Sequence, residues 1–301
     1  MSEGNFTHLT AMLATGIGVC NNCRMARFVL ISAPYHMGVE EAGVGRGPAR
    51  FLAAGAAQAL GIASGEVLRI RPEEATALDV SRHIRRAVHD ALAAQACPVV
   101  LAGNCNSALG ILAGMEAARP GIVWLDAHGD FNTPHTSLSG SLDGMALAAA
   151  VGHCYADLCE AIGLRAPVAE ENVVLAGWRD LDPAERIRLT ESRIAARDAR
   201  SLDQIPPLLT DLRERVNAVY LHIDVDFLDP EESPGVNFRG PGGVPVERAG
   251  RLLAAIVRAV PVRAVGLANH NPEHDPDGRT AKAGVGLLRA IAAAYPSLSP
   301  P

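Results

Sequence analysis

A chain of 301 residues with 49% hydrophobic side chains can bury the core of one large α/β domain or of two smaller ones. Its formal net charge of −6 is mild and its basic residues are scattered, so no electrostatic footprint of a nucleic-acid partner is present. No apolar run reaches the roughly 18–20 residues that a membrane-spanning helix needs. We therefore expect a cytoplasmic protein, without a nucleic-acid or membrane partner, that acts on a small molecule.

The first residues lie outside any regular pattern. The apolar stretch LTAMLATGIGVC follows a segment without basic residues, so it lacks the charged start of a signal peptide. We interpret residues 1–25 as an N-terminal extension, disordered or not native, with Met25 as a plausible true start. Cys20 and Cys23 form a CxxC pair without the second pair that a zinc site needs, and we interpret them as incidental. Residues 26–301 are predicted to form a single domain.

Short apolar runs alternate with helical patterns along the rest of the chain. The runs are rich in β-branched residues at consecutive positions, which is typical of parallel strands covered on both faces. Apolar residues recur every four positions behind Ser81, a candidate N-cap, in residues 81–96, and residues 245–260 repeat this helical pattern. The alternation predicts a doubly wound, three-layer α/β/α fold with a central, mostly parallel sheet. The predicted strands are residues 27–34, 97–103, 121–128, 171–178, 218–226 and 262–269.

Carboxylates and an imidazole follow two of these strands at alternate positions. They are Asp126, His128 and Asp130 after one strand, and Asp224 and Asp226 at the end of another. Alternate side chains of an extended backbone project to the same face, and ligands bind beyond the carboxyl ends of parallel strands. Four carboxylates in one cleft repel each other unless cations lie between them. Carboxylate with imidazole suits ions such as Mn²⁺, so we predict a divalent metal site rather than a set of capping aspartates.

These motifs also carry a family resemblance. DAHGDFNTP and HIDVDFLDP resemble the two metal signatures of the arginase/agmatinase (ureohydrolase) family, and ISAPYHMGVEEAGVGRGPARF, GWRDLDPAE and DGMALAAAVG are similar to its N-terminal loop, substrate loop and central helix. The resemblance covers nearly everything from about residue 28 to residue 290. It implies the three-layer fold, two Mn²⁺ ions per chain, and hydrolysis of a guanidino-type C–N bond by water that the ion pair activates.

The stretch LAGNCNSALG departs from the family pattern GGDHS. An alignment without gaps places Cys105 on the metal-binding histidine and Asn104 on the neighbouring aspartate. A thiol is one of the few side chains that can replace imidazole as a ligand, and the alternative is an inert buried thiol beside an incomplete site. The resemblance then implies a metal-binding set of Cys105, Asp126, His128, Asp130, Asp224 and Asp226.

A second departure concerns proton transfer. Asp143 stands where arginases have a histidine that carries protons to the leaving amine, and a carboxylate is weaker in that role unless its pKa is raised. His135 could replace it if its loop turns inward, and His270 is a further candidate. We take Asp130, Asp143 and His135 as the catalytic candidates.

The substrate contacts are changed at one end only. Asn269 replaces the glutamate that binds the guanidinium in the family, which removes a negative charge. Asn132, Ser139 and Asp182 match positions that hold the α-carboxylate and α-ammonium of the substrate, so the resemblance implies an amino-acid head group. We therefore predict substrate contacts from Asn132, Ser139, Asp182 and Asn269.

These departures favour a substrate less basic than arginine. An N-hydroxyguanidine is neutral at lower pH than a guanidine, and its own N–OH group can relay a proton. The combination resembles the arginase relatives that convert Nω-hydroxy-L-arginine and water to L-ornithine and hydroxyurea in D-cycloserine biosynthesis. The alternatives are another guanidino or formimino substrate, as in an arginase, agmatinase or formiminoglutamase, and a metal-free pseudoenzyme. The sequence leaves the oligomeric state open, and a monomer is compatible with the short segment after the last helix.

Overall fold

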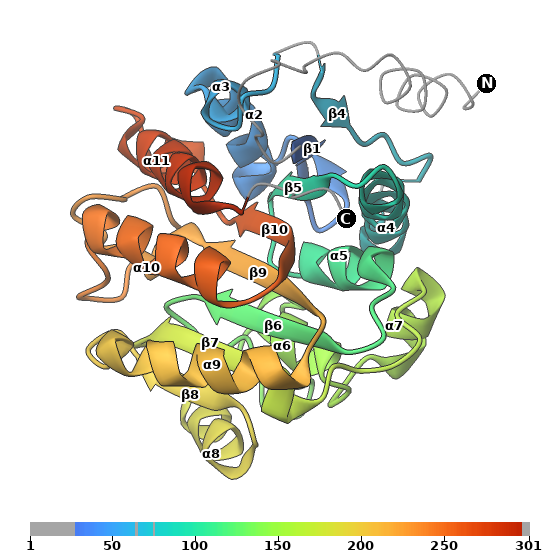
Figure 1. The fold of residues 1–301 in the computed structure, drawn as a ribbon, viewed down its shortest axis with the longest axis vertical. Coiled ribbons are helices and arrows are strands. Elements are labelled where there is room, and N and C mark those ends of the chain that lie inside the picture. Colours follow the sequence, from blue (N-terminus) through green and yellow to red (C-terminus); the bar gives the residue numbers. More distant parts are fainter. Residues whose placement is uncertain (1–27, 64–65, 75, 297–301) are drawn as a thin grey trace.

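A sheet of parallel strands forms the centre of the molecule. The computed structural model describes residues 28–63, 66–74 and 76–296, and within them eight parallel strands form one sheet (Figure 1). The inner strands are buried on both faces, which is why apolar residues occupy consecutive positions in them. The strands are β1 (Phe28–Ala33), β4 (Leu68–Arg69), β5 (Cys97–Ala102), β6 (Pro120–Leu125), β7 (Val173–Trp178), β8 (Ala195–Asp198), β9 (Ala218–Asp224) and β10 (Val262–Ala268).

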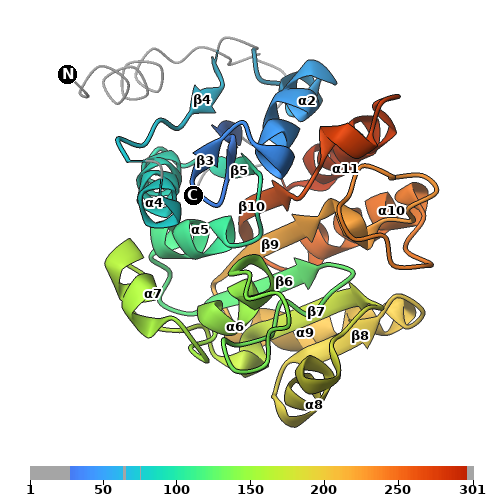
Figure 2. The ribbon, with the colours of Figure 1, turned by 180° about the vertical axis from the view of Figure 1, so that it is seen from behind.

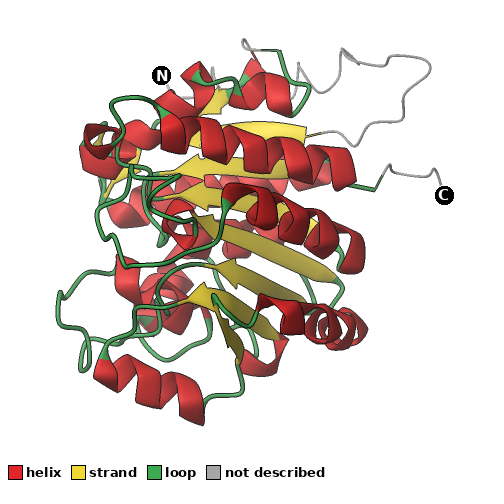
Figure 3. Cartoon of the chain, turned by 90° about the vertical axis from the view of Figure 1, so that its left-hand side faces the viewer, coloured by secondary structure: helices red, strands yellow, loops and turns green. Residues whose placement is uncertain are grey.

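Helices cover both faces of this sheet and divide the core in two. In Figure 3 the sheet lies between two layers of helices, and the strand arrowheads point to one side. One half of the core includes side chains from α2 (Gly47–Ala53), α3 (Ala56–Ala59), α9 (Ile205–Arg215), α10 (Val246–Ala259) and α11 (Arg279–Ala294). The other half includes side chains from α4 (Ala77–Ala93), α5 (Ser107–Met115), α6 (Ala146–Ala150), α7 (Ala156–Ile162) and α8 (Pro183–Glu191).

The strand order brings four loops to one point. The order is β4-β1-β5-β10-β9-β6-β7-β8, and it can be followed from top to bottom in Figure 1 and, from behind, in Figure 2. The chain therefore forms β5 and then β6 at positions that are not adjacent in the sheet, and β10 and β9, which come later in the sequence, lie between them. The loops after these four adjacent strands meet at the carboxyl edge of the sheet, where open parallel sheets bind ligands. A small hairpin of β2 (Tyr35–His36) and β3 (Val39–Glu40) lies beside the loop after β5, since Met37 N donates to Asn104 Oδ1 at 3.0 Å.

Most of this framework agrees with the sequence. The doubly wound fold is confirmed, as are the six predicted strands and the helix predicted over residues 245–260. The N-cap prediction at Ser81 is wrong, because Thr76 Oγ1 accepts a hydrogen bond from Asp79 N at 3.1 Å and caps α4 earlier. The edge strands β4 and β8 were missed because they are short and only half-buried. The predicted extension at residues 1–25, with its CxxC pair, lies outside the described residues.

A buried set of hydrogen bonds joins the loop after β10 to α11. The Asp275 carboxylate accepts hydrogen bonds from Thr280 N and Ala281 N, both at 3.1 Å, and lies 2.9 Å from Nε2 of His270. Burial opposes ionisation of Asp275, but these donors outweigh it and lower the pKa of the carboxyl group. Burial also lowers the pKa of His270. These hydrogen bonds therefore stabilise the folded state most when Asp275 is ionised.

We expect Asp275→Ala to lower the free energy of unfolding at pH 7 by about 2–4 kcal/mol, because it removes three hydrogen-bond acceptor contacts inside the protein. Since the pKa of Asp275 is lower in the folded state, its contribution is complete above the unfolded pKa of about 4 and is lost as the pH falls below it. Urea denaturation of wild type and variant at several pH values measures this. A stability difference that grows toward acid pH would contradict the assignment.

Candidate metal centre

Backbone amides hold the carboxylates that follow β6 and β9. Asp126 and Asp224 are almost completely buried where these neighbouring strands end. Ala127 N donates to Asp226 Oδ1 at 3.0 Å, His128 N donates to Asp126 Oδ1 at 2.7 Å, and Asp226 N donates to Asp224 Oδ1 at 2.8 Å. These bonds fix one carboxylate oxygen of each residue. The second oxygen of Asp126 accepts from Trp124 Nε1 at 3.0 Å, and those of Asp224 and Asp226 face Cys105 and His128. Two loops far apart in the sequence thereby form one acidic site.

Asp126, His128 and Asp226 form the first cluster of candidate metal ligands. His128 Nδ1 lies 3.0 Å from Asp226 Oδ2 and 3.4 Å from Asp126 Oδ1. Burial, and then the charge of Asp226, raise the pKa of Asp126 to about 7. Burial opposes the protonation of His128, but the two carboxylates outweigh it and raise the pKa of the ring. A divalent cation would relieve this repulsion without a proton.

Cys105, Asp126 and His222 form a second cluster, entirely buried. Cys105 Sγ lies 3.1 Å from Asp224 Oδ2, from His222 Nε2 and from Asn269 Nδ2. Burial, and then the charge of Asp224, raise the pKa of the thiol well above its ordinary value. Burial lowers the pKa of His222 to about 3, so the ring is neutral. His222 was not predicted from the sequence. Its position in an apolar strand, two residues before Asp224, is the feature that could have identified it.

Asp130 supplies a buried carboxylate oxygen without a protein partner. Its backbone is in the left-handed region with φ of 47°, and its carbonyl accepts hydrogen bonds from Leu147 N at 3.0 Å and Ala148 N at 3.1 Å. Among the described residues, Asp130 Oδ2 is buried and has no hydrogen-bond partner. Burial, and then the charge of Asp126, raise the pKa of Asp130. An unpartnered oxygen in a site of oxygen, nitrogen and sulfur donors fits a divalent transition-metal ion.

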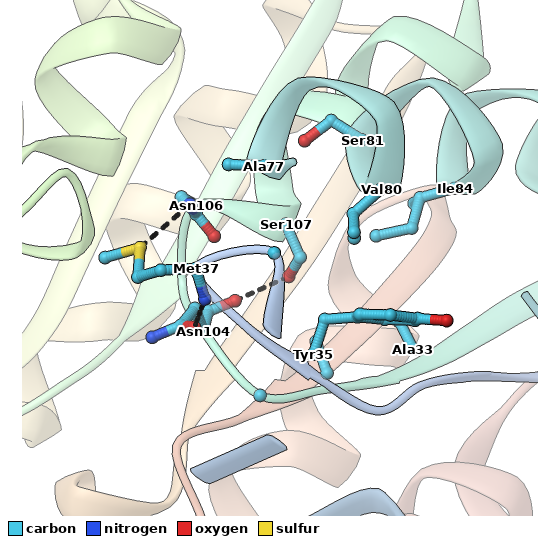
Figure 4. Close-up of a pocket in the computed structure, with 13 residues that line it drawn as sticks. Ala33, Tyr35, Met37, Ala77, Val80, Ser81, Ile84, Asn104, Asn106 and Ser107 are labelled. Atoms are coloured by element: carbon cyan, nitrogen blue, oxygen red, sulfur yellow. Dashed lines mark hydrogen bonds between the residues drawn. The ribbon is translucent and has the colours of Figure 1, made fainter. Parts of the chain in front are cut away.

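Asp143 and His135, two of the candidates for proton transfer, differ in their surroundings. Asp143 is enclosed, since Oδ2 accepts from Asn104 Nδ2 at 2.7 Å and Oδ1 accepts from Asn106 N at 3.2 Å. Burial raises its pKa. Figure 4 shows Asn104 and Asn106 beside Met37 at a small cavity of about 10 Å³. Asp143 thus holds the loop that carries Cys105, whereas His135 is exposed to solvent.

The residues expected to bind the amino-acid head group lie along one loop and the start of α8. Asn132 Nδ2 donates to Asp182 Oδ2 at 3.0 Å, and Asn132 Oδ1 is buried without a partner among the described residues. Ser139 is exposed, and its Oγ accepts from Ser141 N at 3.2 Å. Asn269 lies apart from these residues, in contact with Cys105. The structure therefore pairs Asn132 with Asp182 and places Asn269 at the second cluster.

Several supporting residues were not found from the sequence. Glu185 Oε1 accepts a hydrogen bond from Phe131 N at 2.8 Å and holds the loop after β6. Arg179 Nη2 donates to the carbonyl of Asp226 at 2.7 Å and holds the loop after β9. Gly177 has φ of 99°, and a Cβ there would lie 2.2 Å from the ring of Phe227. These contacts shape the loops around the carboxylates and have no local sequence signal.

An all-parallel sheet with such a set of donors at its carboxyl edge is the arrangement of an α/β enzyme with a candidate metal site. The family model described as the arginase family matches residues 26–294. The arginase of Agrobacterium fabrum is 32% identical over 283 residues, which cover 84% of this chain and 86% of that protein. The arginase of Bacillus caldovelox is 28% identical over 288 residues, which cover 87% and 96% of the two chains.

Solved structures agree with these relatives. The Bacillus caldovelox arginase superposes with a TM-score of 0.80 at 26% identity and covers 89% of this chain and 98% of that one. Formimidoylglutamase from Bacillus subtilis shares the fold, with a TM-score of 0.71 at 16% identity and coverage of 91% and 88%. The chain belongs to the arginase family. It is a ureohydrolase, an enzyme that hydrolyses C–N bonds of guanidino compounds. None of the described helices has the length and hydropathy to span a membrane.

We expect Gly177→Ala to lower the free energy of unfolding by about 2–4 kcal/mol and to reduce metal content. The new methyl group would clash with the Phe227 ring, whose backbone directly follows Asp226, and the φ of 99° is strained for alanine. Gly286→Ala in α11 is the matched control, because nothing lies within 4 Å of a Cβ there. Chemical denaturation and metal analysis provide the measurements. Equal stability of the two variants would rule out this role of Gly177.

Proposed function

We propose that the protein converts Nω-hydroxy-L-arginine and water to L-ornithine and hydroxyurea. We also assign it to the cytoplasm from its sequence features and, by its resemblance to the arginase relatives that form hydroxyurea, to D-cycloserine biosynthesis. Asn269 supports the substrate part of the proposal. The side chain at this position, which lies against Cys105 and Asp224, is a neutral amide and not a carboxylate. An amide donor cannot neutralise a guanidinium ion, whereas a less basic N-hydroxyguanidine needs no such partner. Two Mn²⁺ ions would be held by Cys105, Asp126, His128, Asp130, Asp224 and Asp226.

The bound ions would supply hydroxide near neutral pH, because two cations together acidify a shared water molecule. Asp130 Oδ2, which is buried and unpartnered among the described residues, would be the acceptor for a proton of the attacking water. The water oxygen would form a bond to the guanidino carbon, the C–N bond to the ornithine side chain would break, and the departing nitrogen must gain a proton. Asp143 is not the donor in this proposal, because both of its oxygens already accept hydrogen bonds in the loop of Cys105. The N–OH group of the substrate relays the proton instead.

At the other end of the substrate, Asp182 provides a negative charge for the α-ammonium group. Asn132 is held against Asp182 and offers its unpartnered Oδ1 as a second acceptor. Ser139 is exposed and can donate its hydroxyl to the α-carboxylate. These contacts orient the substrate through its amino-acid head group. The guanidino carbon is thereby positioned for reaction although no charged side chain binds that end of the substrate.

A substrate panel tests the proposal. Protein reconstituted with Mn²⁺ is assayed with Nω-hydroxy-L-arginine, L-arginine, agmatine and N-formimino-L-glutamate. We expect kcat/KM to favour the hydroxylated amino acid over arginine by at least about 10-fold, or about 1.4 kcal/mol of transition-state binding. Asn269→Glu should shift this ratio toward arginine because it restores a negative charge. Arginine turnover as efficient as that of the hydroxylated form would end the substrate assignment, and the protein would then act as an arginase.

The role of Cys105 has a separate test. We expect Cys105→Ala and the nearly isosteric Cys105→Ser to lose one of two Mn²⁺ ions, because neither side chain offers a thiolate ligand. Metal analysis after dialysis, together with activity on the hydroxylated substrate, measures the effect. Full metal occupancy with unchanged activity in the alanine variant would show that the thiol is inert. An absence of bound metal in the wild type would instead favour a pseudoenzyme.

A further inference from the structure

One buried residue at the centre, His222, has no role in the proposed function. It lies on β9 two residues before Asp224, so both side chains project to the same face of the sheet. Its side chain is completely buried, and the ring is neutral. A buried histidine inside an apolar strand loses its hydration and needs partners for both ring nitrogens. The identity of those partners indicates what the residue does.

The surroundings fix the His222 ring in one orientation. The Trp124 ring on β6 stacks against it with centroids 3.6 Å apart, and Tyr220 Oη lies 2.8 Å from Nδ1. Gly266 stands beside His222 in the register of β10, and a Cβ at this glycine would lie 2.3 Å from Tyr220 Oη. Because Gly266 has no side chain, there is room beside His222 for the hydroxyl group of Tyr220. Three strands thus direct Nε2 toward one point.

At that point Nε2 meets the other candidate ligands. It lies 3.1 Å from Cys105 Sγ, which in turn lies 3.1 Å from Asp224 Oδ2. The ligand atoms of Cys105, Asp126 and His222 are all within 4.8 Å of one another. With zinc-type bond lengths of about 2.3 Å to sulfur and about 2.1 Å to nitrogen, the two atoms are about 3.1 Å apart at a right angle and about 3.6 Å apart at a tetrahedral angle. The observed spacing therefore suits two ligands of a single ion.

We propose that His222 is a metal ligand that binds through Nε2 to the same ion as Cys105. This inference rests on the proposed metal pair and adds a seventh side chain to its ligands. The imidazole that position 105 lacks is thereby supplied from β9, with Tyr220 Oη as the partner of Nδ1 that orients the ring, an arrangement typical of metal-binding histidines. Sulfur and nitrogen together make this half of the centre softer than the half formed by Asp126, His128 and Asp226.

The test measures coordination directly. The full chain is crystallised with Mn²⁺, and anomalous scattering locates the ions independently of any activity. We expect one ion within about 2.3 Å of His222 Nε2, a bonding distance, and bonded also to Cys105 Sγ. A distance above about 3 Å would make His222 a hydrogen-bond partner of the thiol and would overturn the inference. In that case the inference about His222 would fail, but the proposed metal pair and hydrolysis would stand. Wild-type protein without an ion pair would overturn both the inference and the proposed function.

Variants add a measurement in solution. We expect His222→Gln to weaken binding of one Mn²⁺ by more than about 100-fold, beyond the roughly 10–100-fold effect of a residue that only orients a ligand. Tyr220→Phe, which removes the hydroxyl beside Nδ1, should stay within that smaller range. The matched control is His270→Gln, which alters an equally buried histidine paired with Asp275 and should retain both ions. Equal Mn²⁺ affinity of wild type and His222→Gln, measured by titration, would also overturn the inference.

Discussion

The burial of four carboxylates at one point of the sheet is the constraint on which the rest of the structure depends. Asp126, Asp130, Asp224 and Asp226 are each at most 7% exposed. Like charges this close, and removed from water, cost several kcal/mol unless cations or hydrogen-bond donors face them. Backbone amides satisfy only part of this requirement, and one oxygen of Asp130 has no partner among the described residues. The donor set therefore fits a site for cations.

The same constraint explains how the loops around the site are held. The loops must stay in place against the repulsion of the carboxylates. Each loop is held by hydrogen bonds to a side chain that is not one of the candidate metal ligands. Glu185 holds the loop after β6, Arg179 holds the loop after β9, and Asp143 holds the loop after β5. Asp143 therefore serves the architecture of the Cys105 loop. This leaves proton delivery to the substrate in the reaction that we propose.

The parts of the fold that are encoded locally could be predicted from the sequence. Consecutive apolar residues identified the inner strands, and alternate aspartates after them identified the acidic site, because both patterns arise within a few residues. His222 was missed since a lone histidine in an apolar strand is typical of the core, and its partner Cys105 is 117 residues away. Gly177 was missed for the same reason, because only the packed Phe227 ring shows why a side chain is excluded there. Thr76 was not identified as the cap of α4, because Ser81 was chosen from the apolar repeat that follows it.

The passage of the chain from β5 to β6 has a consequence for biosynthesis. Strands in a sheet are about 4.8 Å apart, so the space for β9 and β10 keeps β5 and β6 about 14 Å from each other. Cys105 and Asp126 leave the ribosome long before the two strands that come to lie between them. A nascent chain that ends before β9 lacks Asp224 and Asp226, and its β5 and β6 have no strand between them. The acidic site is therefore complete only after β9 and β10 have entered the sheet between β5 and β6.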